Sequence, residues 1–231
     1  YSVNEGTNLN IHGTGFSVSD VDAASGTLTA TLNVGEGIVT ISLGDSGASI
    51  SSGNGSGTVV LTGTIAQLNA LLTGTSTGTI VYFNGNDTPA ASTTITLTVN
   101  DQGNTGVDPG LTADGSSEED SASQTINITA VNDAPVLTTI PGGGTYYEGS
   151  PGTYVDAGVS ITDADSFDFN GGVLTVTISA NGESTDRLTI LNGNGVTVSA
   201  SNVSYDDGGG AVVVATFTGG VGSGDPLLIT F

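Results

Sequence analysis

The stretch Thr93-Thr-Ile-Thr-Leu-Thr-Val99 decides the fold class, because its apolar and polar side chains alternate with a period of two. Successive side chains of a strand point to opposite faces, so this pattern predicts a strand with one buried and one solvated face. The same alternation recurs at 27–32, 38–43 and 124–131, and Gly-rich turns such as 35–37 separate these segments. Many short alternating strands joined by such turns predict an all-β chain built of sandwiches.

One segment departs from this alternation. Residues 64–72 carry apolar side chains at 65, 68, 71 and 72, which is a helical spacing. Thr64 is followed three residues later by Gln67, the pattern of a capping box. We therefore predict one short helix, crossing from one sheet to the other.

The string Ala130-Val-Asn-Asp-Ala-Pro135 divides the chain of 231 residues. We predict one domain over 1–133 and a second over 134–231. Strands in the second domain are expected at 154–161, 173–178, 187–190, 196–200, 211–217 and 227–231.

The second domain has no counterpart of the helix or of the last two strands of the first, so we expect it to be incomplete at its C-terminal end. The favoured expectation is that the natural protein continues past Phe231 and completes the sandwich in cis. The alternative is that a second copy donates its Tyr1–Val3 segment in trans, which would build a filament.

The charge of the chain is strongly one-sided, with 23 Asp and Glu against one basic residue, Arg187, and a net charge of −22. Nucleic acids and anionic membrane surfaces are therefore not expected as partners, because both need Lys and Arg. Unpaired carboxylates repel one another in a compact state, and bound cations would relieve that cost. A halophilic or marine origin is the rival explanation. No apolar run approaches the roughly 20 residues of a membrane helix, so membrane insertion is not expected.

Acidic motifs occur twice in the same order. Glu5 is followed by Asp20-Val-Asp22, and Glu148 is followed by Asp163-Ala-Asp165, with Asn132-Asp-Ala-Pro135 between the two sets. Ca²⁺ takes about 6–8 oxygen ligands, and a junction between two domains is a natural place to collect them. The competing interpretation is turn chemistry, because Asp and Asn cap backbone amides without any metal. That interpretation is the favoured one for Asp206-Asp207.

These motifs resemble those of the cadherin-like repeats of large bacterial surface proteins and adhesins. Asn132–Pro135 resembles the linker between repeats, Glu5 and Glu148 match the Glu near the end of the first strand, and Asp101 matches the Asp after the long strand. The resemblance covers the first domain and about two-thirds of the second. It implies tandem Greek-key β-sandwiches of the cadherin or immunoglobulin type that bind Ca²⁺.

The resemblance also implies two sets of ligands. The junction set consists of Glu5, Asp87, Asn132, Asp133, Asp163 and Asp165. The set at the N-terminal end of the first domain consists of Asp20, Asp22 and Asp101. The linker has Ala130 and Val131 where animal cadherins carry a further Asp, so one or two ions are expected rather than three.

The function that follows is an extracellular structural or adhesive module, stiffened by calcium, of a long cell-surface protein or filament. Its partners would be neighbouring repeats of the same protein. No catalytic activity is expected, because the chain lacks Cys and Lys and has a single histidine, His12. The alternative function is a carbohydrate-binding accessory domain of a secreted glycan-processing protein. It would use Tyr146, Tyr147 and Tyr154, the only dense group of aromatic residues.

Overall fold

The computed structural model describes residues 1–231 except 22, 24, 104–118, 140–144 and 156–157. The described part consists of strands and one short helix, which confirms the predicted all-β class. None of its helices is long and apolar enough to span a membrane. The chain separates into two units, Tyr1–Asp165 and Ser166–Phe231, each taken by itself below.

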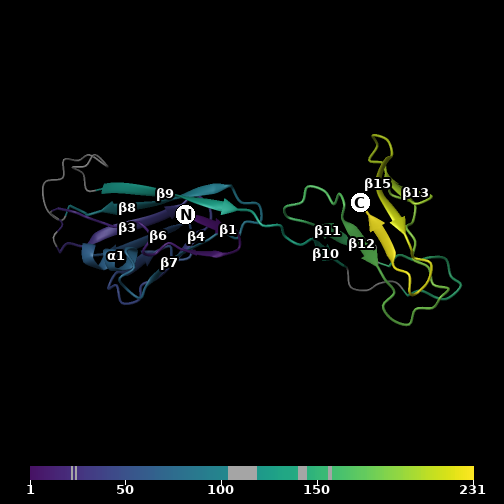
Figure 1. Cartoon of the computed structure of the whole chain (residues 1–231), viewed down its shortest axis with the longest axis horizontal. Coiled ribbons are helices and arrows are strands. Elements are labelled where there is room, and N and C mark those ends of the chain that lie inside the picture. The colour runs from purple at the N-terminus through teal and green to yellow at the C-terminus, as the bar shows by residue number, and fades with distance from the viewer. Residues whose placement is uncertain (22, 24, 104–118, 140–144, 156–157) are drawn as a thin grey trace. The chain divides into compact units, whose positions relative to one another are not determined.

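The described residues of the first unit form three sheets, which are drawn in Figure 1. The six-stranded sheet has the order β1 (Ser2–Asn4), β9 (Glu119–Thr129), β8 (Ser92–Asn100), β3 (Leu28–Val34), β6 (Thr58–Gly63) and β5 (Ser49–Ser52). The three-stranded sheet has the order β2 (Asn8–Asn10), β7 (Thr79–Phe83) and β4 (Ile38–Ser42). The third sheet is the antiparallel pair β10 (Val136–Thr138) and β11 (Ser160–Thr162).

The six- and three-stranded sheets share one hydrophobic core. Leu32 and Ile95 enter it from the six-stranded sheet, and Ile41 and Tyr82 enter it from the three-stranded sheet. Along β3 the apolar residues are buried while the threonines between them are partly exposed. The predicted alternation at 27–32, 38–43, 93–99 and 124–131 therefore corresponds to observed strands.

The predicted helix is present as α1 (Ile65–Leu72). Thr64 is its N-cap: Gln67 N donates to Thr64 Oγ1 at 3.4 Å, and Thr64 N donates to Gln67 Oε1 at 2.9 Å. Leu68, Leu71 and Leu72 are buried in the core. Because α1 follows β6 and precedes β7, it carries the chain from one sheet to the other, as predicted.

The sequence Phe16-Ser-Val-Ser19 predicts a strand that ends just before Asp20, but residues 16–19 do not form a strand. Phe16 and Val18 are buried in alternation, which is why the pattern resembles a strand. The Asn69 side chain of α1 supplies the backbone hydrogen bonds of Val18 instead. Val18 N donates to Asn69 Oδ1 at 2.8 Å, and Asn69 Nδ2 donates to Val18 O at 2.7 Å.

The N-terminal segment is paired within the six-stranded sheet of the same chain. Strand β1 pairs parallel with β9, from Ser2 opposite Asn127 to Asn4 opposite Thr129. The segment proposed as a donor to a second copy is therefore already paired in cis.

The second unit contains a five-stranded antiparallel sheet. Its order is β12 (Val173–Val176), β16 (Leu227–Thr230), β15 (Val212–Thr218), β14 (Asn202–Tyr205) and β13 (Val196–Ser199). Strand β14 was not predicted, and the strand expected at 187–190 is wrong. That segment is held as a loop, because Leu188 N donates to Gly220 O at 3.0 Å and the Arg187 guanidinium donates to Asp186 O at 2.7 Å.

The division into units falls after Asp165, so the connector and the β10–β11 pair belong to the first unit. Of the strand expected at 154–161, only β11 forms within the described residues, and 156–157 lie outside them. The limits 1–133 and 134–231 stay a prediction.

Candidate metal centre

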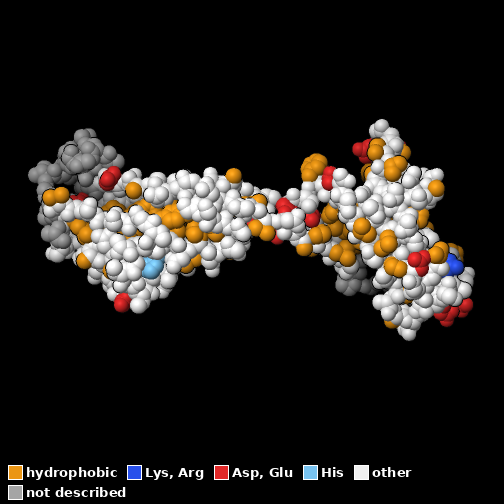
Figure 2. Space-filling view, in the orientation of Figure 1, with side chains coloured by type: hydrophobic (Ala, Val, Ile, Leu, Met, Phe, Trp, Pro, Cys, Tyr) orange, Lys and Arg blue, Asp and Glu red, His pale blue; other side chains and the backbone are white. Residues whose placement is uncertain are grey.

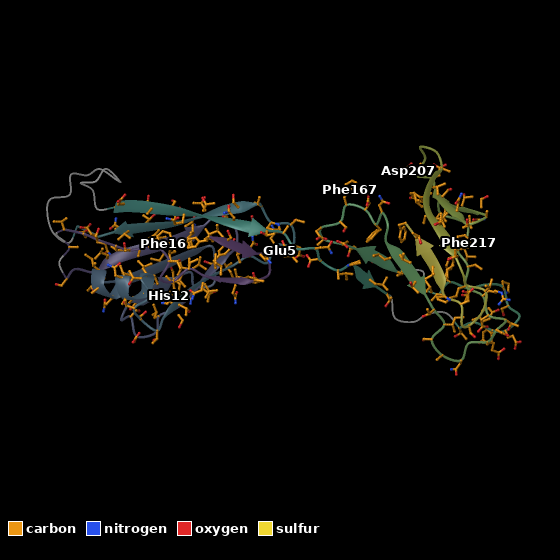
Figure 3. The ribbon with its side chains drawn as sticks, viewed as in Figure 1. Glu5, His12, Phe16, Phe167, Asp207 and Phe217 are labelled. Carbon is orange, nitrogen blue, oxygen red and sulfur yellow. The ribbon has the colours of Figure 1, made fainter. Side chains whose placement is uncertain are left out.

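Glu5 is the most constrained acidic residue of the predicted junction set. It follows β1, where Glu5 N donates to Thr129 O at 3.0 Å, and its side chain is only 8% exposed. Its Oε1 accepts from Val131 N at 2.7 Å, whereas its Oε2 is buried and has no hydrogen-bond partner in the described structure. A buried carboxylate oxygen without a donor is costly, and a hard cation would satisfy it. Figure 3 shows Glu5 at the end of the unit where β9 leads into the connector.

Asp87 lies in loop 84–90 between β7 and β8, and this loop is tied to the Glu5 turn. Gly6 N donates to Asn84 O at 2.7 Å. The Asn84 side chain is buried, and its Oδ1 accepts from Asn86 N at 3.0 Å. The Asp87 side chain is exposed beside these anchored asparagines. The Glu5 turn and loop 84–90 are thus linked through a backbone hydrogen bond.

The connector meets the second Asp-x-Asp motif directly. Asp133 N donates to Asp165 Oδ2 at 3.0 Å, and Asp165 N donates to Asp163 Oδ1 at 3.3 Å. The second bond closes a turn, so 163–165 curl rather than extend, as sharing a metal requires. Asn132 Nδ2 donates to Asp133 O at 2.7 Å, which orders the connector between them.

The carboxylates of this set act on one another electrostatically. Burial raises the pKa of Asp133 above its usual value, and the charges of Asp87, Asp165, Glu5 and Asp163 raise it further. Four other carboxylates of the predicted junction set are therefore close enough to Asp133 to repel its charge. The chain's one basic side chain, Arg187, lies in the other unit. Figure 2 shows acidic side chains gathered where the connector leaves β9.

The donor set fits calcium in its chemistry. Carboxylate and amide oxygens are the ligands that hard divalent cations prefer, and the crowding of negative charge favours a cation. Among the described residues, however, no three acidic or histidine side chains have converged on a common metal-binding point. Two of the predicted ligand oxygens, Asp163 Oδ1 and Asp165 Oδ2, accept hydrogen bonds from backbone N–H groups. An ion would have to compete with those hydrogen bonds.

The N-terminal set is organised by turn bonds. Asp20 Oδ1 accepts from Ala23 N at 2.8 Å, and Asp101 Oδ1 accepts from Gly103 N at 3.0 Å. Asp22 lies outside the described residues. Asp206 likewise forms a turn, because its Oδ1 accepts from Gly208 N at 2.8 Å and Gly210 N at 3.0 Å.

Sequence reasoning missed Glu36, which lies between β3 and β4. Its Oε1 accepts from Asn86 Nδ2 at 2.7 Å, and its Oε2 accepts from Ala90 N at 3.1 Å. The hydrogen bond from the Asn86 side chain, and then that from Ala90 N, hold the pKa of Glu36 below its usual value. The sequence marks this place only as a Gly-Glu-Gly turn, so no local signal identifies its partners.

No family model, curated protein or solved structure matches this chain.

Proposed function

We propose that this chain is a calcium-binding structural or adhesive module of a long extracellular surface protein or filament. Its ion would be held by Glu5, Asp87, Asn132, Asp133, Asp163 and Asp165, and Asp20, Asp22 and Asp101 would contribute to a second site at the other end of the first domain. The observation that carries this proposal is the buried Oε2 of Glu5, which has no hydrogen-bond partner in the described structure, together with the carboxylates whose charges raise the pKa of Asp133.

The proposed architecture is two tandem Greek-key β-sandwiches of the cadherin or immunoglobulin type, over 1–133 and 134–231. Support comes from the single core shared by the six- and three-stranded sheets and from the crossing of α1 between them. In such an array calcium would fix the 163–165 turn against the connector and so stiffen the chain. Repeated sandwiches with stiff joints suit a spacer, and we propose no catalytic activity.

The proposed partners are neighbouring repeats of the same protein at the cell surface. Donation of Tyr1–Val3 to another copy is the minor alternative. It would require release of β1 from β9, including loss of the 2.9 Å hydrogen bond from the Tyr1 amino group to Thr125 O.

Calcium should raise the melting temperature of the chain. Binding to the native state alone stabilises by about 2.7 kcal/mol at a hundredfold excess over Kd. The measurement is thermal unfolding in EDTA and in millimolar Ca²⁺, together with a scattering profile under both conditions. Identical melting temperatures and profiles would contradict the proposal.

Two substitutions and one control locate the effect. Asp133→Ala and Asp165→Ala each remove a proposed ligand and should weaken the calcium response. Asp206→Ala removes an acid of the other unit that is bonded within its own turn, so it should leave the calcium response unchanged. Equal responses in all three variants would show that calcium acts elsewhere.

A carbohydrate-binding module is the second candidate function, because Tyr146, Tyr147 and Tyr154 are all exposed. Aromatic side chains in this state offer flat apolar surfaces to a sugar ring. Binding of a glycan panel that is lost in Tyr147→Ala, without a calcium response in the unsubstituted chain, would favour this candidate.

A further inference from the structure

The Glu36 side chain forms hydrogen bonds with the loop that carries Asp87, at residues on either side of Asp87 in the sequence. Its carboxylate reaches a segment 50 residues away along the chain, accepting from Asn86 Nδ2 at 2.7 Å. Its other oxygen accepts from Ala90 N at 3.1 Å. These two hydrogen bonds lie before and after Asp87 in the sequence, so Glu36 closes the loop that presents this residue.

Further hydrogen bonds hold the Glu36 backbone and the loop of Asp87 in place. Glu36 N donates to Thr93 Oγ1 at 3.0 Å, and Thr93 is buried in β8. Within the loop, Thr88 N donates to Asn86 Oδ1 at 3.2 Å. The loop therefore has one buried end at Asn84 and one charge-assisted clamp at Glu36. Such bonds to an ionised carboxylate are among the stronger ones in proteins.

A clamp of this kind matters where like charges meet. The charge of Asp87 repels that of Asp133, so an unsupported loop would move Asp87 away from the other carboxylates. Groups that orient metal ligands without touching the metal commonly decide its affinity. Both Glu36 oxygens already accept N–H donors, so Glu36 is suited to orienting a ligand rather than to being one.

We propose that Glu36 is a positioning residue for calcium, holding Asp87 in place as a ligand while making no contact with the ion. This inference rests on the calcium-binding function proposed above. It places one further residue behind the six proposed ligands and gives it a role that the acidic motifs do not contain.

The first experiment is a calorimetric calcium titration of the full chain and its variants. Glu36→Ala should weaken calcium affinity by about 10-fold to 100-fold, the usual cost of losing a residue that orients a ligand. Asp45→Ala is the matched control. Like Glu36, Asp45 accepts from a backbone N–H and from a side chain of another loop, here both at Thr77. Asp45→Ala removes the same charge as Glu36→Ala. Equal losses of calcium affinity in the two variants would therefore show that only net charge matters, and they would overturn the proposal.

A double-mutant cycle tests whether Glu36 acts through Asp87. Asp87→Ala should weaken binding by itself, and adding Glu36→Ala to it should cost little more. Glu36→Gln keeps one acceptor oxygen, so its affinity should fall between those of the wild type and Glu36→Ala. Additive losses from Asp87→Ala and Glu36→Ala would show that Glu36 acts independently of Asp87 and would overturn the inference.

Hydrogen exchange provides a readout that does not depend on the ion. In EDTA, the Ala90 amide should exchange faster in Glu36→Ala than in the wild type or in Asp45→Ala, and unchanged exchange would contradict the clamp.

Different results would overturn the proposed function and this inference. A wild-type chain that does not bind calcium ends the proposed function and this inference with it, whereas normal wild-type affinity that persists in Glu36→Ala overturns the inference alone.

Discussion

At the scale of single residues, acidic side chains have three different roles in this chain. Asp133 sits among other carboxylates, which raise its pKa together with burial. Asp206 satisfies turn amides, and Glu36 clamps a distant loop. The sequence separates the first from the second by motif order, but it cannot identify the third. Which N–H groups face Glu36 is decided by the pairing of β3 with β8, across more than 50 residues.

Asp45 should contribute to the pH dependence of stability. Its Oδ1 accepts from Thr77 N at 2.7 Å and from Thr77 Oγ1 at 3.1 Å, and these bonds hold the pKa of Asp45 below its usual value. A depressed pKa in the folded state adds stability above the unfolded pKa, and that stability is lost as the pH falls through the folded value. Below a pH of about 4, the ordinary range of an Asp carboxyl, we expect the free energy of unfolding to fall.

Asp45→Asn isolates this contribution. It should lower the free energy of unfolding at neutral pH and flatten its decline in acid, as measured by urea unfolding between neutral pH and strongly acidic buffer. If the free energy of unfolding of Asp45→Asn falls with pH in parallel with that of the wild type through the acid range, the hydrogen bonds from Thr77 do not contribute to the pH dependence of stability.

At the scale of elements, predictability follows the distance over which the signal acts. Helix α1 was predicted with its cap, because Thr64, Gln67 and the apolar spacing all lie within nine residues. The strand expected at 16–19 was wrong, because the Asn69 side chain satisfies the Val18 backbone from 51 residues away. Likewise, the loop at 187–190 is held by the Gly220 carbonyl, a partner that alternation in the sequence does not reveal.

The capping box of α1 should be a measurable source of stability. Thr64→Ala removes the Oγ1 that accepts from Gln67 N and leaves an amide of the first turn unpaired. We expect a loss of about 1 kcal/mol in the free energy of unfolding, the usual value for an N-cap. Urea unfolding would measure it, with Thr94→Ala as a control at an exposed threonine of β8. If Thr64→Ala costs no more stability than Thr94→Ala, the loss reflects the removal of a threonine side chain in general and not the loss of the N-cap hydrogen bond.

At the scale of the whole molecule, two explanations of the net charge of −22 make different predictions. If the charge is an adaptation to salt, screening alone should stabilise the chain, because the Debye length shrinks from about 30 Å at 0.01 M to about 3 Å at 1 M. If the carboxylates around Asp133 form a binding site, millimolar Ca²⁺ should stabilise the chain at constant ionic strength, where screening is unchanged.

Asp133→Ala separates these explanations. It removes one of 23 acidic side chains, so the gain in melting temperature from NaCl should persist almost unchanged, since screening acts on all of them. The gain from Ca²⁺ at fixed ionic strength should shrink, because a proposed ligand and part of the local repulsion are both gone. Thermal unfolding in EDTA across a NaCl series, and then across a Ca²⁺ series in constant NaCl, measures both gains. If Mg²⁺ or NaCl reproduces the calcium gain, or if Asp133→Ala lowers both gains alike, the carboxylates act as a diffuse charge and not as a site.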